Sequence, residues 1–133
     1  MAVVSCKTLP VASEADVVLV RARVREAAIA LGFTLVDQTK FVTAASELAR
    51  NTLIHGRGGE MELSTLNGPR AGIRLDFRDK GPGIPNIELA LRDGFTTGSG
   101  LGLGLGGAKR LVNEFEISSR PGEGTTVAIT RWK

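Results

Sequence analysis

The chain has 133 residues, of which 42% are hydrophobic and 23% charged, and its formal net charge is +3. This is the composition of a globular domain with a real core, and it excludes a disordered chain. The basic residues are scattered and Tyr is absent, so composition gives little support to nucleic-acid binding. Cys6 is the single cysteine, which excludes an internal disulfide. We expect Cys6 to be a small buried residue.

The N-terminal half predicts one strand followed by two helices. Residues 2–11 are typical of an edge strand. Ser13, followed by acidic residues, is a helix-capping signal, and apolar residues then recur at helical spacing until Gly32. A second helix is predicted from near Asp37 to Gly56. No long apolar run indicates a signal peptide or a membrane span, so we expect one soluble cytoplasmic domain over residues 1–133.

The second helix carries polar residues beside its packing side. Glu47, Asn51 and His55 are spaced i, i+4, i+8 and share one stripe of the helix. A carboxylate and a carboxamide next to a core need partners, since otherwise they cost free energy. Alone, Glu47 would be a solvated helix residue, and His55 a helix-end residue near the negative pole. We assign no role to His55.

The C-terminal half predicts a hairpin and further α/β elements. Residues 60–66 and 71–79 alternate with period two around an Asn-Gly-Pro turn, which indicates an antiparallel hairpin that ends at Asp79. The elements predicted next are a turn at 80–85, a helix at 87–91, a helix at 103–113, a strand around 115–117, a turn at 121–124 and a strand at 125–132. This order predicts an α/β (α+β) two-layer sandwich with a mixed, mainly antiparallel sheet covered by helices on one face.

The segment 96–107, TTGSGLGLGLGG, is rich in glycine just before a predicted helix. Glycine is tolerated where the backbone takes φ > 0 or approaches something closely, and a helix start presents free N–H groups to a phosphate. We expect this segment to be weakly ordered without a ligand. It matches the dinucleotide fingerprint GxGxxG at 102–107 but lacks the strand that must precede it. No GxxxxGK[ST] occurs, which excludes a Walker-type nucleotide site.

Together, these polar segments suit one nucleotide site. Asp79 at a strand end can accept from an exocyclic amino group such as that of adenine, and Gly81 and Gly83 let the backbone approach a flat base. The glycine loop takes phosphates. Asn51 offers the oxygen that Mg²⁺ prefers. Glu47, one turn earlier, can take a proton from an attacking hydroxyl.

These segments resemble the N, G1, G2 and G3 boxes of the GHKL (Bergerat-fold) ATPases. The matching stretches are Glu47–Asn51, DKGPGI at 79–84, GSGLGLGLGGAKRL at 98–111 and GEGT at 122–125. The resemblance covers nearly the whole chain in the right order. Within that superfamily, DGFTTGSGLGLGLGGAKRLVNEFEI and the ending GTTVAITRWK are most similar to the anti-sigma-factor serine/threonine kinases of the RsbT type, the switch kinases of the stressosome.

The resemblance implies Mg-ATP binding, phosphorylation of serine or threonine on a STAS-domain (RsbS/RsbR-like) partner, and activation of a PP2C-type phosphatase by contact. By motif, Asn51 would bind Mg²⁺, Glu47 would be the general base, and Asp79 would recognise adenine. The other ATP contacts implied are Gly81, Gly83, Ile84, Gly98, Gly100, Leu101, Gly102, Leu103, Gly104, Lys109 and Thr125. In some relatives a basic residue precedes the G2 glycines and helps to hold the phosphates, whereas this sequence has Thr97 and Gly98 there.

Two other functions remain open. The chain could be an anti-sigma factor that binds a sigma subunit and phosphorylates its antagonist, or a non-catalytic module in which nucleotide only sets the conformation. A histidine-kinase catalytic domain is disfavoured, because the sequence has no dimerisation helices and no separate phosphoacceptor. Glu47 separates the kinases from the passive module, since only a kinase needs a base.

Overall fold

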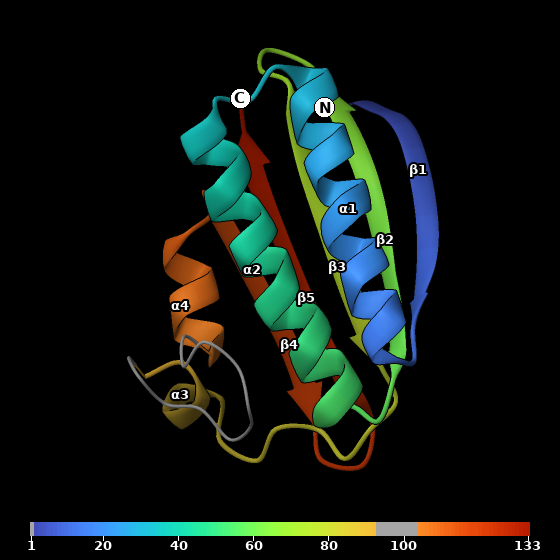
Figure 1. Ribbon diagram of the computed structural model, residues 1–133. Coiled ribbons are helices and arrows are strands. Elements are labelled where there is room, and N and C mark those ends of the chain that lie inside the picture. The colour runs from blue at the N-terminus through green and yellow to red at the C-terminus, as the bar shows by residue number, and fades with distance from the viewer. Residues whose placement is uncertain (1, 93–103) are drawn as a thin grey trace.

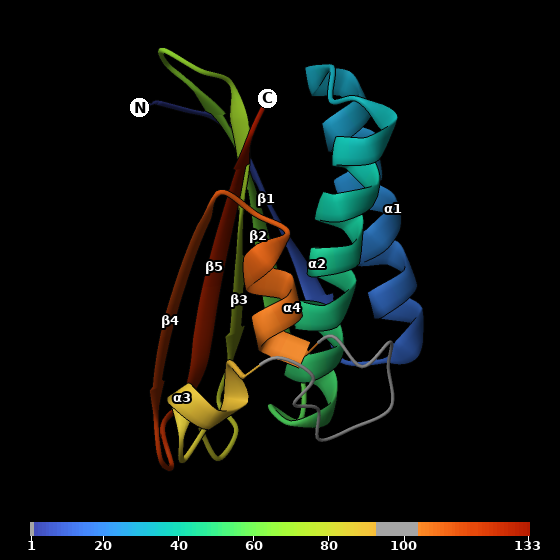
Figure 2. The same ribbon diagram turned by 90° about the vertical axis from the view of Figure 1, so that its left-hand side faces the viewer.

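The computed structural model describes residues 2–92 and 104–133. Its elements follow the predicted order, with a short helix and a glycine-rich segment between the two halves of the sheet. They are β1 (Ala2–Val11), α1 (Glu14–Leu31), α2 (Leu35–Ile54), β2 (Gly59–Asn67), β3 (Gly72–Asp79), α3 (Ile87–Ala90), α4 (Gly104–Arg110), β4 (Glu114–Arg120) and β5 (Gly124–Trp132). The sheet forms one layer, and α1, α2 and α4 cover one of its faces (Figures 1 and 2).

The sheet has the order β1-β2-β3-β5-β4. β1 lies at an edge, as predicted, and all four pairings are antiparallel. The parallel pair that a mixed sheet implies is therefore absent from the part of the chain that the structure describes. β3 and β4 do run in the same direction, but β5 lies between them and pairs with both. The prediction of a two-layer sandwich is confirmed, and its sheet is antiparallel.

Side-chain caps set the ends of the two long helices. The Ser13 hydroxyl accepts from the backbone N–H of Asp16, and Gly32 ends α1 in the left-handed conformation at φ 91°. α2 begins before the predicted Asp37, because the Thr34 hydroxyl accepts from the Asp37 N–H at 3.1 Å. Asp37 thus lies in the first turn, where its negative charge is favourable.

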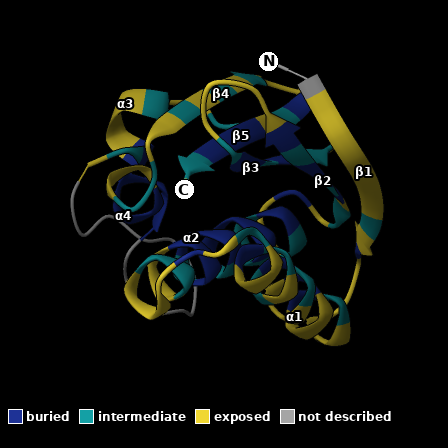
Figure 3. Ribbon diagram, turned by 90° about the horizontal axis from the view of Figure 1, so that it is seen from above, coloured by how far each residue is buried: buried dark blue, intermediate teal, exposed yellow. Residues whose placement is uncertain are grey.

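The core lies between the helices and the sheet, and Figure 3 shows the buried sides of α1 and α2 facing the strands. Phe41 and Leu48 of α2 are 0% and 1% exposed, and they pack with buried strand residues such as Met61, Leu75 and Ile129. Each such side chain contributes about 1.5–3 kcal/mol when it is fully buried. This packing fixes α2 rigidly against the sheet, and α2 carries the polar stripe.

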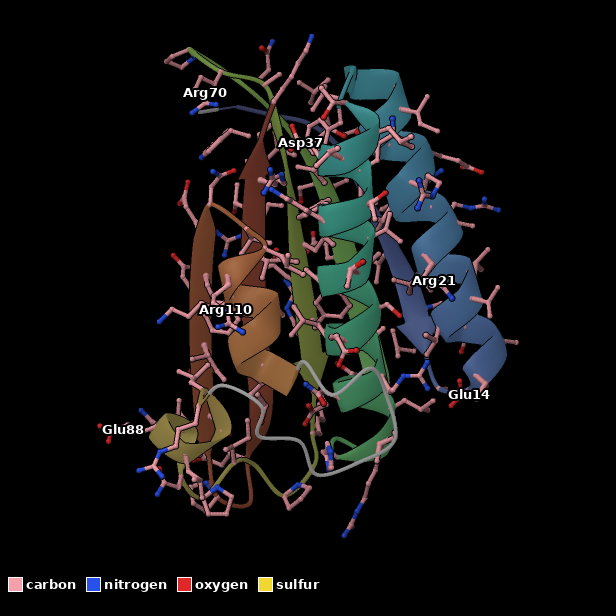
Figure 4. All side chains as sticks on the ribbon, turned by 60° about the vertical axis from the view of Figure 1, so that its left-hand side comes forward. Glu14, Arg21, Asp37, Arg70, Glu88 and Arg110 are labelled. Atoms are coloured by element: carbon pink, nitrogen blue, oxygen red, sulfur yellow. The ribbon has the colours of Figure 1, made fainter. Side chains whose placement is uncertain are left out.

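An ion pair between Arg131 and Asp37 fixes the N-terminal end of α2. The Arg131 guanidinium of β5 donates to Asp37 at 2.6 Å and to the carbonyl of Leu111 at 2.8 Å. Figure 4 shows Asp37 at the N-terminal end of α2, near the sheet. The hydrogen bond from Arg131 lowers the pKa of Asp37. Arg131 therefore joins α2 and the chain after α4 to the same strand.

The face of the sheet away from the helices is polar, and Cys6 lies there. The prediction that Cys6 is buried is wrong: it is exposed, and its thiol donates to Glu62 at 2.6 Å. Glu62 also accepts from Arg78 at 2.6 Å. The hydrogen bonds from Cys6 and then Arg78 lower the pKa of Glu62, while the bond to Glu62 raises the pKa of the Cys6 thiol. Strand alternation put Cys6 on the open face, which composition could not reveal.

The helices of the described ranges are short or contain charged residues, and none of them is long and apolar enough to cross a membrane.

Candidate functional site

A cavity of about 390 Å³ opens at the end of the sheet where α2 and β3 end. Figures 1 and 2 show α3, the start of α4 and the β4–β5 turn at this same end. Six predicted site residues line the cavity: Asn51, Asp79, Gly83, Ile84, Gly104 and Thr125. The volume lies in the range of about 300–1,000 Å³ that is usual for small-molecule sites. Residues far apart in the sequence are thus brought to one place.

Much of the remaining cavity wall is apolar. Leu48 of α2, Phe77 of β3 and Val127 of β5 contribute from the core side, and Ala90 and Leu105 contribute from α3 and α4. These residues could not be recognised as site residues from the sequence, because each also fits an ordinary core pattern. A mainly apolar wall with a few polar groups is typical of a small-molecule or cofactor site.

The Asp79 carboxylate is held by the backbone. Its Oδ1 accepts from the N–H of Gly81 at 2.9 Å and from the N–H of Thr125 at 3.2 Å. Both donors belong to the main chain, so they hold the carboxylate at one edge of the cavity. Oδ2 lies beside Gly56, and within residues 2–92 and 104–133 no donor lies within hydrogen-bond distance of it, so this oxygen keeps its capacity to accept.

Gly56, after the end of α2, packs directly against this carboxylate. A Cβ on Gly56 would overlap the Asp79 side chain, and a Cβ on Gly81 would come within 2.8 Å of the Gly56 backbone. The two glycines therefore allow the turn after β3 to lie against the end of α2. Gly81 does not line the cavity; it contacts the site through its N–H, which donates to Asp79 Oδ1. Gly56 could not be recognised as a site residue from the sequence, because it contributes by having no side chain where Asp79 packs.

The turn at 79–84 also docks on the β4–β5 hairpin. The Ile84 N–H donates to the Ser119 hydroxyl at 2.7 Å, and the Gly122 N–H donates to the Pro82 carbonyl at 2.8 Å. Gly83 has φ +81°, and a Cβ there would overlap the Arg120 carbonyl. We call these contacts between residues 79–84 and 119–125 the turn–hairpin junction. It fixes one wall of the cavity.

The polar stripe of α2 leads into the cavity. Asn51 and His55 line it, and Glu47 lies one turn earlier with only 6% of its surface exposed. Glu47 is not a lining residue of the cavity. The Asn51 carbonyl accepts from the N–H groups of His55 and Gly56, at 2.9 and 3.1 Å. These bonds complete the last turn of α2 beside Asp79.

The remaining predicted residues lie on or before α4. Gly104 begins α4 with φ 61° and lines the cavity, whereas Lys109 is exposed and does not line it. α4 ends at Arg110 rather than near residue 113, so Arg110 lies at the opposite end of this helix from Gly104. Gly98, Gly100, Leu101, Gly102 and Leu103 lie outside the described residues, as does the predicted weak order of their segment.

The side chains that could ligate a metal ion can be compared with what the expected Mg²⁺ requires. Within residues 2–92 and 104–133, no group of three or more His, Cys, Asp or Glu side chains could hold a metal ion. Mg²⁺ does not require such a group, because it is usually held by one or two protein oxygens together with phosphates. The carboxamide of Asn51, on the wall of the cavity, fits that requirement.

Comparison with known proteins identifies the family. Residues 36–133 match the profile of the histidine kinase-, DNA gyrase B- and HSP90-like ATPases. The chain belongs to this family. It is 41% identical over 121 residues to the serine/threonine-protein kinase RsbT of Bacillus subtilis, covering 90% of this chain and 91% of that protein. This GHKL chain is accordingly a protein serine/threonine kinase that uses ATP.

Other relatives extend the comparison. The chain is 32% identical over 104 residues to an anti-sigma F factor of Thermoanaerobacter, covering 74% of this chain and 73% of that protein. Among solved structures, the RsbU and RsbW domains of a Mycobacterium tuberculosis protein superpose with a TM-score of 0.65 at 23% identity. That superposition covers 96% of this chain and 32% of the other, and it supports the GHKL fold alone.

The contact between Gly56 and Asp79 predicts the effect of one methyl group. Gly56→Ala should raise the Kd for ADP about tenfold, because the new Cβ displaces the Asp79 carboxylate. Gly68→Ala, in the β2–β3 turn outside the cavity, is the control and should leave the Kd unchanged. Isothermal titration calorimetry measures both values. Unchanged ADP affinity in a folded Gly56→Ala protein would contradict the role of this contact.

Proposed function

We propose that this kinase is a partner switch. It transfers the γ-phosphate of ATP to a serine or threonine of a STAS-domain protein of the stressosome type, and it activates a PP2C-type phosphatase by contact once that partner is phosphorylated. The observation that carries the proposal is the α2 stripe, in which buried Glu47 lies one turn from Asn51 on the cavity wall. Similarity to RsbT over nine tenths of the chain supports the choice of partners. We place this activity in the cytoplasm.

We assign adenine recognition to one group of site residues and the contacts to Mg²⁺ and the phosphates to another. Asp79 recognises the adenine amino group, since Oδ1 is already engaged with two backbone N–H groups and Oδ2 is left to accept. Ile84 and Thr125 line the same end. Asn51 holds Mg²⁺ through its carboxamide oxygen, together with the phosphates. The glycines at 98–104 and Lys109 are proposed to contact the phosphates.

Glu47 is the proposed general base. Mg-ATP supplies an electrophilic γ-phosphoryl group, and the partner's hydroxyl must lose a proton as it attacks. The side chain of Glu47 is on the same helix stripe as Asn51 and is shielded from bulk water, so it can take that proton near the phosphate end. Because α2 is packed against the core, the base and the metal ligand keep a fixed spacing.

A second candidate rests on the similarity to anti-sigma F factors. In that case the chain binds a sigma subunit and phosphorylates the protein that antagonises this binding. The two proposals share the ATP site and differ in what the kinase binds once its partner is phosphorylated, a PP2C-type phosphatase in the first and a sigma subunit in the second.

The decisive experiment incubates the protein with radiolabelled ATP, Mg²⁺ and the STAS-domain proteins encoded near it. We expect label on a serine or threonine of one STAS protein, and none when Mg²⁺ is removed with EDTA. Nucleotide binding without transfer to any of them would overturn the proposed STAS-domain substrate. Co-purification with a sigma subunit would favour the anti-sigma factor. Co-purification with a PP2C-type phosphatase would favour the switch kinase.

A further inference from the structure

We propose that Ser119, a β4 residue outside the motif segments, orients the Thr125 hydroxyl and so makes the cavity selective for adenine. The inference rests on the proposed ATP site and concerns which nucleobase that site accepts. Ser119 acts through Thr125, so it is a positioning residue rather than a catalytic one.

Ser119 lies at the centre of the turn–hairpin junction. It is the partner of Thr125 in the pairing of β4 with β5, and the two hydroxyl oxygens are 2.8 Å apart. The Ser119 oxygen also accepts from the Ile84 N–H at 2.7 Å and lies 3.3 Å from the Gly124 carbonyl. Ser119 is thus in contact with both sides of the junction, while Thr125 lines the cavity.

One arrangement of the two hydroxyl protons makes Ser119 the donor to Thr125. Each hydroxyl has one proton to donate, and the Ser119 oxygen already accepts from Ile84. Its own proton can go to Thr125 at 2.8 Å or to the Gly124 carbonyl at 3.3 Å. The shorter distance is the one typical of an O–H···O bond, and the longer one is beyond the usual range. Either hydroxyl could donate across the 2.8 Å contact, and the proposal takes Ser119 as the donor to Thr125.

This assignment leaves the Thr125 proton free to point into the cavity. Thr125 is adjacent to Asp79, because its backbone N–H donates to Asp79 Oδ1. The cavity edge then presents an acceptor, the Asp79 carboxylate, beside a donor, the Thr125 hydroxyl. Adenine carries the complementary pair, an amino donor beside a ring-nitrogen acceptor. Hypoxanthine and guanine carry the reverse pair, a carbonyl acceptor beside an N–H donor, and a mismatch of this kind leaves polar groups unpaired.

The junction does not depend on the Ser119 hydroxyl alone. The Gly122–Pro82 and Thr125–Asp79 hydrogen bonds also connect its two sides, so Ser119→Ala should retain the wall of the cavity. What the variant loses is the direction of the Thr125 proton. Base selectivity should therefore fall by more than overall stability, which separates positioning from simple packing.

The test compares the Kd for ADP with that for inosine diphosphate, which differs from ADP only along this edge of the base. We expect Ser119→Ala to raise the ADP Kd about tenfold and to leave the inosine diphosphate Kd nearly unchanged, so the preference for adenine falls about tenfold. Ser119→Thr keeps the hydroxyl and should restore the preference. Ser118→Ala, at an exposed position of the same strand, is the matched control and should change neither value.

A double-mutant cycle tests the route through Thr125. In a Thr125→Val background, Ser119→Ala should cause no further loss of selectivity. In kinase assays Ser119→Ala should raise the KM for ATP and leave kcat unchanged. Equal weakening of both nucleotides, or no change in either, would overturn the inference while the proposed function stands. Wild-type protein that binds no ADP would overturn both.

Discussion

Glu47→Gln is expected to bind ATP as tightly as the wild type and to lose phosphotransfer by a factor of about 10²–10⁴. Gln has nearly the same volume as Glu, so it fills the buried position beside Asn51 and leaves no void in the packing. It cannot accept a proton at neutral pH, so the attacking hydroxyl loses its base. Because Glu47 does not line the cavity, its removal should lower kcat and leave the KM for ATP unchanged.

The measurement is single-turnover transfer of radiolabelled γ-phosphate to the STAS partner, with ATP affinity measured separately by calorimetry. Glu116→Gln provides a matched control, because Glu116 lies on the open face and pairs there with Arg74 at 3.2 Å. It should retain the wild-type rate. A Glu47→Gln protein that transfers phosphate at the wild-type rate would show that Glu47 is not the base.

The order of elements was accessible from the sequence because it depends on local signals. Ser13 and Gly32 bound α1 as predicted, through a side-chain cap and a left-handed glycine. α2 begins at Leu35, slightly before the predicted start near Asp37, because the Thr34 hydroxyl makes the cap. Such errors are small, since a cap moves a boundary by one turn.

Properties that depend on distant partners were not accessible. Whether the sheet is mixed depends on β5 entering between β3 and β4, a pairing between residues about fifty positions apart in sequence. Local periodicity contains no information on that strand order. The exposure of Cys6 is different, because it follows from the alternation of β1, in which buried Val11 faces the core and Cys6 faces the other way, toward Glu62.

The candidate site likewise contains residues that can be recognised from the sequence and residues that cannot. Asn51, Asp79 and Thr125 stand out in the sequence because their motifs have characteristic spacing, and the structure brings all three to one cavity. Gly56 and Ser119 do not stand out. One acts through the absence of a side chain beside Asp79, and the other through a hydroxyl whose partners are Ile84 and Thr125. Their roles become visible only when the turn–hairpin junction is assembled.

Asp79→Asn is expected to weaken ADP binding about 100-fold or more. The amide oxygen can still accept from the N–H groups of Gly81 and Thr125, as Oδ1 does at 2.9 and 3.2 Å. The amide nitrogen then takes the place of Oδ2 and turns a donor toward the adenine amino group, which is also a donor. An unpaired donor and the loss of a charge-assisted hydrogen bond together account for about 3 kcal/mol, which corresponds to a factor of about 100.

Calorimetric titration with ADP and with inosine diphosphate distinguishes recognition from damage. Asp76→Asn is the control, because Asp76 lies on the same strand but on the open face, where it pairs with Arg74 at 3.1 Å; its ADP affinity should equal that of the wild type. Inosine carries a carbonyl where adenine has its amino group, so it can accept from the new amide nitrogen. Asp79→Asn should therefore lose far less affinity for inosine diphosphate than for ADP. Equal losses for the two nucleotides would mean that Asp79 supports the cavity wall and does not read the base.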